Sequence, residues 1–212
     1  MFSARVVEGS HDVDMRLAEL GLEQSVLVEA LNLANLYRVR TTDHHPKLYR
    51  YQIMYGETVA ALRDLLVPNG WKKLDDGNYE LTINAAGTVA IAVASGDVNT
   101  GIATSTPSNK SPKGRHTIDA VQLNRQADLF AELLPTVPSG RRQIDTWVLL
   151  HHITKNKIQA ELSRPNEIDE DGKIVAWSER ILFDAISLDG EAIIINQPQL
   201  PDIDIKISRK SV

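Results

Sequence analysis

Tyrosines and basic residues are interleaved over residues 36–56, a pattern that suits contact with nucleic acid. The segment holds four of the five tyrosines and four basic residues, whereas Asp43 is its only acid. Aromatic rings stack on bases, and guanidinium and ammonium groups hold phosphates. We therefore predict a nucleic-acid-binding surface made of Tyr37, Arg38, Arg40, Lys47, Tyr49, Arg50 and Tyr51. The alternative is that the tyrosines are half-buried packing residues with hydrated hydroxyls and that the arginines form a solvated face.

Charge is distributed unevenly along the chain. The formal net charge is −5, yet the stretch from Glu167 to Asp204 holds ten acids and only two basic residues, Lys173 and Arg180. A molecule that is acidic in one part and basic in another can bind a polyanion despite a negative net charge. The charge balance therefore argues against a wholly basic nucleic-acid coat, but it allows a local basic surface.

A second candidate site is the segment 95–117, which is rich in Ser, Thr, Gly, Pro and Lys. It contains a loop of about twenty residues, which is unusually long for a compact domain. The loop follows an apolar strand and ends at the start of a predicted helix, where free N–H groups and the helix dipole attract anions. We predict an anion-binding site at Lys110, Lys113, Arg115, His116 and Thr117. The segment lacks the Gly-x-x-x-x-Gly-Lys-Ser/Thr pattern of a Walker loop.

Asp97 lies just after the same apolar strand and is the one catalytic candidate, as a metal ligand or a general base. In that case the chain is a phosphoester hydrolase or a nucleotide-processing enzyme with its site at the 95–117 loop. The alternative is that the Asp97 carboxylate accepts N–H groups of its own turn, as aspartates in turns often do. The sequence leaves open whether the chain is an enzyme.

Metal and cofactor sites are not predicted. Histidines occur as two adjacent pairs, His44 with His45 and His151 with His152. Adjacent residues of a strand point to opposite faces, so His151 and His152 do not serve one metal. The recognised metal-ligand spacings are missing from the sequence. The chain contains no cysteine, which excludes disulfides, thiolate catalysis and zinc sites with sulfur ligands.

Hydrophobic periodicity predicts three helices in the N-terminal third and one later helix. In the second of them, Leu27, Leu31 and Ala34 recur at the spacing of one helix face. The predicted helices span residues 12–20, 23–40, 57–67 and 117–134, and the predicted strands span residues 71–74, 78–84, 88–95, 144–154, 157–164, 173–183, 191–196 and 202–208. Asp-Gly pairs at 76–77 and 171–172 mark hairpin turns between strands.

These elements define an α+β fold, with a helical N-terminal third followed by two antiparallel β-meanders linked by a long loop and one helix. Residues 1–67 form the helical segment, and residues 68–212 form an α+β domain built on antiparallel sheet. We expect the helices to pack on the sheet in one compact unit. The chain is 42% hydrophobic and 24% charged, close to the globular average, which excludes a disordered or fibrous chain.

The terminal strand 202–208 alternates isoleucines with polar residues. Such a strand either closes the sheet of its own chain or adds to the sheet of a protein partner or a second copy. Because no segment matches a signal peptide or a membrane span, we predict a cytoplasmic protein without a membrane partner. The sequence favours a non-enzymatic binding protein that contacts nucleic acid or acts as a subunit of a larger complex.

Overall fold

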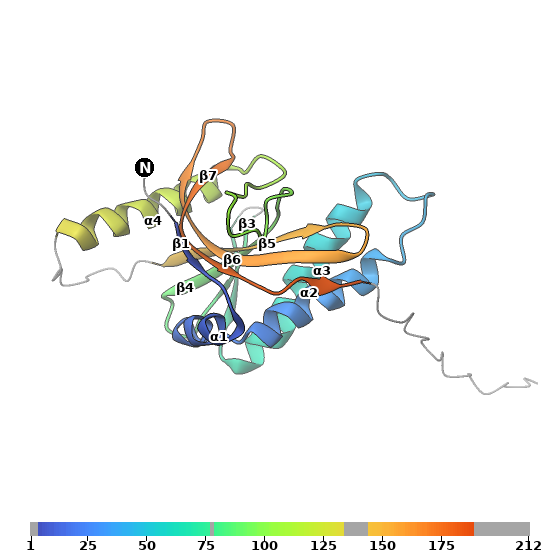
Figure 1. Cartoon of the computed structure of the whole chain (residues 1–212), viewed down its shortest axis with the longest axis horizontal. Coiled ribbons are helices and arrows are strands. Elements are labelled where there is room, and N and C mark those ends of the chain that lie inside the picture. The colour runs from blue at the N-terminus through green and yellow to red at the C-terminus, as the bar shows by residue number, and fades with distance from the viewer. Residues whose placement is uncertain (1–3, 77–78, 134–143, 189–212) are drawn as a thin grey trace, which may run out of the picture.

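The computed structural model describes residues 4–76, 79–133 and 144–188, which form an α+β fold (Figure 1). Four α-helices and one 3-10 helix lie within these residues. They are α1 (Ser10–Glu19), α2 (Gln24–Arg38), α3 (Tyr49–Leu66), the 3-10 helix η1 (Val67–Asn69) and α4 (Arg115–Leu133). Over the same ranges, none of the helices is long and apolar enough to cross a membrane.

One mixed sheet forms the centre of the described structure. Its strands are β1 (Arg5–Val7), β2 (Lys72–Asp76), β3 (Tyr79–Ile83), β4 (Val89–Ser95), β5 (Asp145–Ile153), β6 (Lys157–Ile168), β7 (Ile174–Leu182) and β8 (Ile186–Ser187). The strand order is β1-β7-β6-β5-β4-β3-β2, and β8 pairs with β6. β1 is parallel to β7 and β4 is parallel to β5, whereas the other neighbours are antiparallel.

The prediction of a purely antiparallel sheet is therefore wrong at two places. β4 and β5 run parallel because the loop 96–114 and α4 carry the chain back to the end of the sheet where β4 begins. β1 has no counterpart among the predicted strands, because three residues are too few to show an alternating pattern. The predicted strands 191–196 and 202–208 lie outside the described residues.

Helices α1, α2 and α3 cover one face of the sheet, and α4 and the loop 96–114 lie on the other (Figure 1). Alternation along the strands supplies apolar side chains to both faces. Trp147 and Leu149 of β5 pack with the three helices. Val148 and Leu150 of the same strand pack on the opposite side with Trp177 of β7. The sheet is therefore buried on both faces.

Helix α3 begins at Tyr49, well before the predicted start at Glu57. The prediction failed because Gly56 in a helix interior costs about 1 kcal/mol relative to alanine. Packing outweighs that cost, since Met54 is buried in the core and the hydroxyl of Thr58 donates to the Met54 carbonyl at 2.6 Å. The early start places Tyr51 on a helix, where it faces the pocket described below.

Candidate anion-binding site

The connection between α2 and α3 is held by local hydrogen bonds. The hydroxyl of Thr41 donates to the carbonyl of Arg38 at 2.8 Å, and the N–H of Thr42 donates to Nδ1 of His45 at 3.0 Å. The ring of His45 stacks on Tyr49 with the centroids 4.9 Å apart. These contacts fold the connection into a compact turn that brings the end of α2 and the start of α3 to one pocket.

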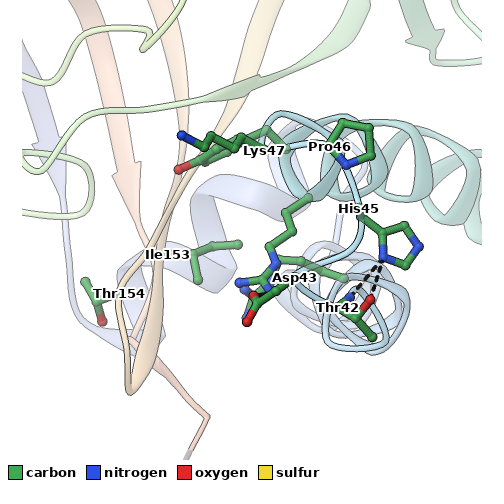
Figure 2. Close-up of a pocket in the computed structure, with 10 residues that line it drawn as sticks. Thr42, Asp43, His45, Pro46, Lys47, Ile153 and Thr154 are labelled. Atoms are coloured by element: carbon green, nitrogen blue, oxygen red, sulfur yellow. Dashed lines mark hydrogen bonds and ion pairs between the residues drawn. The ribbon is translucent and has the colours of Figure 1, made fainter.

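This pocket, the arginine pocket, has a volume of about 510 Å³ and lies between the connection and the end of β5. Its lining residues are Arg38, Thr42, Asp43, His45, Pro46, Lys47, Arg50, Tyr51, Ile153 and Thr154. Figure 2 shows residues of the connection on one side, Ile153 and Thr154 on the other, and the His45 ring directed to Thr42. The pocket is therefore lined both by the helical layer and by the end of a strand.

Positive charge exceeds negative charge in the arginine pocket. Arg38, Lys47 and Arg50 line it with one acid, Asp43, whose exposed carboxylate lies 3.3 Å from an Nη of Arg50. Nε of Arg38 donates to the neutral side-chain amide of Asn35 at 2.8 Å, and Arg38 has no ion pair within the described part of the chain. Burial and the neighbouring charge of Arg50 lower the pKa of Arg38. An anion placed between two such guanidinium groups would stabilise both of them.

The long loop contributes Lys110 next to the arginine pocket. Its Nζ lies over the ring of Tyr51, 4.1 Å from the ring centroid. A cation at this distance is attracted by the electron-rich face of the ring. The sequence alone does not show whether the two basic segments share a face, and the contact between Lys110 and Tyr51 joins them at one point.

Three of the residues predicted to bind nucleic acid do not line the pocket. Arg40 lies over the ring of Tyr37, 5.4 Å from its centroid, and Tyr49 is stacked on His45. Tyr37 is 47% exposed and Tyr49 is 36% exposed. One face of the Tyr37 ring is covered by Arg40, and one face of the Tyr49 ring is covered by His45. Part of the remaining surface of each ring is in contact with solvent.

The residues of the loop that were predicted to bind an anion lie at different places and contact different neighbours. Lys110 lies over Tyr51, whereas Lys113 and Thr117 line a second, smaller pocket together with Tyr79. The five residues therefore do not converge on one anion. Only Lys110 is placed beside the arginine pocket.

At the start of α4, the other two predicted residues have neighbours of their own. An Oδ of Asp119 lies 3.8 Å from Nε of Arg115, and both side chains are exposed. His116 stacks on Tyr79 with the ring centroids 6.4 Å apart. The Arg115 side chain thus lies near an acid of its own helix.

Asp97 lies in a tight turn after β4. Its Oδ1 accepts the N–H of Asn99 at 3.0 Å, and its Oδ2 accepts the side-chain amide of Asn99 at 3.3 Å. The N–H of Asp97 itself donates to the carbonyl of Ser108 at 3.0 Å. Because both carboxylate oxygens accept from the same turn, this geometry favours the turn-forming role over that of a base or metal ligand.

The histidine pair at the end of β5 points to two faces, as the alternation of a strand requires. Nε2 of His151 lies 3.3 Å from the hydroxyl of Ser95, and Nδ1 of His152 lies 3.3 Å from the carbonyl of Gly96. Burial, with Lys113 and His152 nearby, lowers the pKa of His151 to about 4. In residues 4–76, 79–133 and 144–188, His, Asp and Glu side chains form no group of three that could hold a metal.

Some pocket residues carry no signal in the sequence. Thr42 and Pro46 lie inside the basic segment but have no charge or aromatic ring that marks them. Ile153 and Thr154 come from the end of β5, far along the chain, and reach the pocket only through the tertiary fold.

Comparisons with protein-family models, curated proteins and solved structures gave no match to this chain.

Proposed function

We propose that the protein is a non-enzymatic binding protein that holds the phosphate backbone of a nucleic acid in the arginine pocket. The observation that carries this proposal is the convergence of Arg38, Arg50 and Lys47 on one pocket of about 510 Å³. A guanidinium group presents its N–H donors in a rigid fork that matches two phosphate oxygens. A pair of such groups with an adjacent ammonium group suits a polyanion.

Exposed tyrosine rings beside the pocket favour a single strand over a duplex. Tyr51 lines the pocket and is 50% exposed, and Tyr49 and Tyr37 also present aromatic surface to solvent. Stacking on such rings requires bases that are not paired and stacked within a duplex, and it tolerates any base sequence. We therefore expect single-stranded DNA or RNA to bind more tightly than duplex DNA.

A hydrolase centred on Asp97 has weaker support. Both carboxylate oxygens of Asp97 accept hydrogen bonds from Asn99. The basic residues assigned to phosphate in that alternative, Lys110, Lys113 and Arg115, have three different sets of neighbours. Binding without catalysis is therefore the function that we propose.

The test is fluorescence anisotropy with labelled single-stranded DNA, duplex DNA and RNA at two salt concentrations. Arg38→Gln and Arg50→Gln should each weaken binding at low salt by roughly fivefold or more, because each removes a charge-assisted contact to phosphate. Each substitution should also reduce the salt dependence by about 0.7 in the slope of log K against log salt for a single strand.

Arg125→Gln is the matched control, because Arg125 is an exposed arginine of α4 on the other side of the sheet. It should change the affinity by about twofold at most, since a distant exposed charge is screened by salt. Undetectable binding of every nucleic acid at low salt contradicts the proposal. Equal losses in Arg125→Gln and Arg38→Gln contradict the assignment to the arginine pocket.

A further inference from the structure

The sheet opens into a fork between β3 and β4. The two strands pair at Ile83 with Ala90 and at Thr82 with Ile91, and the pairing ends there. An antiparallel ladder continued in the same register would place Glu80 opposite Val93. Instead β3 diverges from β4, and a slot separates the residues that the ladder would have joined.

This slot has a volume of about 190 Å³. Tyr79 and Glu80 of β3, Val93 of β4 and Tyr55 of α3 line it. Lys113 from the long loop and Thr117 of α4 add polar groups to the lining. Pockets for drug-sized ligands measure ~300–1,000 Å³, so a slot of this size takes a smaller group.

Hydrogen-bonding groups with no partner face into the fork from both sides. The hydroxyl of Tyr79 is buried and has no hydrogen-bond partner within the described residues. Nζ of Lys113 forms no ion pair or hydrogen bond within the same residues. Burial lowers the pKa of this ammonium group, and the nearby carboxylate of Glu80 offsets part of that effect. The carboxylate of Glu80 accepts a hydrogen bond from the hydroxyl of Tyr55.

The backbone of Val93 adds a donor and an acceptor. Asn84 N–H donates to the carbonyl of Val89 at 2.9 Å, and Lys110 N–H donates to the carbonyl of Ser95 at 2.8 Å. Backbone groups of a strand alternate between its two neighbours, so the N–H and C=O of Val93 point to the same side as those of Val89 and Ser95. β3 does not reach Val93 to pair with them.

These groups restrict the chemistry of an occupant. A simple anion would meet the carboxylate of Glu80, and an apolar group would leave the Tyr79 hydroxyl and the Lys113 ammonium unpaired at a cost. Burial raises the pKa of Tyr79, so its phenol remains a hydrogen-bond donor at neutral pH. The occupant therefore carries both acceptors and donors within a small volume, as the edge of a nucleobase does.

We propose that the slot between β3 and β4 binds a nucleobase of the same nucleic acid whose phosphate lies in the arginine pocket. This inference rests on the proposed function and adds base recognition to it. The two sites are adjacent, because Tyr51 of the arginine pocket and Tyr55 of the slot lie four residues apart on α3, a rise of about 6 Å. The long loop also reaches both sites, because Lys110 lies over Tyr51 and Lys113 lines the slot.

The experiment compares two labelled single strands of equal length and charge, one with bases and one made of abasic residues. Anisotropy measures the dissociation constant of each strand. The quantity compared is the dissociation constant of the abasic strand divided by that of the strand with bases. Lys113→Met and Tyr79→Phe should each lower this ratio by about fivefold, because each removes one hydrogen bond to the base. Lys72→Met removes an exposed lysine of β2 and should leave the ratio unchanged.

Tyr79→Phe removes an unpaired hydroxyl, so the variant should fold with an unchanged or higher Tm, which circular dichroism checks. A ratio near one in the wild type, or a ratio that survives both substitutions, overturns base binding in the slot. Arg38→Gln should weaken both strands equally and keep the ratio. Failure of the wild type to bind either strand at low salt overturns the proposed function and this inference with it.

Discussion

His151 makes the stability of the protein depend on pH. Its imidazole is buried at the end of β5, and burial lowers its pKa to about 4. In the unfolded chain its pKa returns to about 6.5. Between these two values the unfolded state binds a proton that the folded state does not, so stability falls as the pH drops from about 6.5 towards 4 and is unaffected above that window.

His151→Gln should remove this component of the pH dependence. We expect the free energy of unfolding of the wild type to fall between about pH 7.5 and pH 5 by on the order of 2 kcal/mol more than that of the variant. Urea unfolding at the two pH values measures the difference. His44→Gln, at an exposed histidine, should behave like the wild type. An identical pH dependence of the wild type and His151→Gln would show that His151 titrates normally.

Glu161 and Arg180 form a buried ion pair beneath the long loop. Oε2 of Glu161 lies 2.6 Å from an Nη of Arg180, and the side chains are 0% and 3% exposed. Arg180 also donates to the carbonyls of Ile102 and Ser105, and Glu161 accepts the N–H of Gly101. The pair therefore fixes the loop to the sheet.

Glu161→Gln leaves the buried guanidinium of Arg180 without its counter-charge, and we expect a loss of about 3–5 kcal/mol in the free energy of unfolding. Urea denaturation measures this loss. Glu170→Gln, at an exposed turn residue, should change stability by less than about 0.5 kcal/mol. The double variant Glu161→Leu with Arg180→Leu should recover part of the loss, because it leaves no unpaired charge. A loss equal to that of Glu170→Gln would show that the pair contributes little.

At the residue scale, the sequence predicts a group when its members lie close together in the chain. Arg38, Lys47 and Arg50 fall within one basic segment, so their types and spacing were sufficient to single them out. Lys113 was singled out for its charge, but its neighbour Tyr79 was not, because the slot depends on where the β3–β4 ladder ends. No property of either residue type shows where a ladder stops.

Among the elements, α4 is held to the sheet by an ion pair between Asp128 and Arg164 and by one buried amide, that of Asn124. Nδ2 of Asn124 donates to the carbonyls of Thr146 at 2.8 Å and Pro165 at 3.1 Å. Oδ1 of Asn124 accepts the N–H of Thr146 at 3.0 Å. Since the side chain is 0% exposed, water does not replace these bonds.

Asn124→Ala should therefore destabilise the protein by about 2–3 kcal/mol, because it leaves buried backbone groups of two strands unpaired. Hydrogen exchange should show faster exchange in α4 than in the rest of the fold. The control is Gln122→Ala, at an exposed position of the same helix. If both variants lose the same stability, Asn124 does not anchor the helix.

Elements with a long periodic pattern were predicted well, and those set by tertiary packing were not. The stripe of Leu27, Leu31 and Ala34 on α2 is fully buried, as its spacing indicates. The first two turns of α3 were not predicted, because Gly56 has a low helix propensity and only packing in the folded protein stabilises the helix there. β4 and β5 are parallel because the intervening loop and helix carry the chain back to the end of the sheet where β4 begins. The local pattern of apolar and polar residues does not show this return.

For the whole molecule, we predict one cooperative unfolding transition for residues 1–67 and 68–212. Leu17 and Leu27 from the first part belong to the same core as Trp147 from the second. All three tryptophans lie in the second part, whereas α1, α2 and α3 lie in the first. Tryptophan fluorescence and far-UV circular dichroism should therefore give the same urea midpoint. Two separate midpoints would show that the helical segment unfolds independently.

The order of strands in the sheet also governs when the protein can fold as it is synthesised. β5, β6 and β7 are neighbours, and strands made earlier flank them on both sides, β4 beside β5 and β1 beside β7. β1 leaves the ribosome long before its partner, since Arg5 pairs with Glu179 at the other end of the described chain. A nascent chain that stops before Ile174 has no strand for β1 to join. Completion of the sheet therefore waits until β7 has been synthesised, and this long-range pairing slows folding.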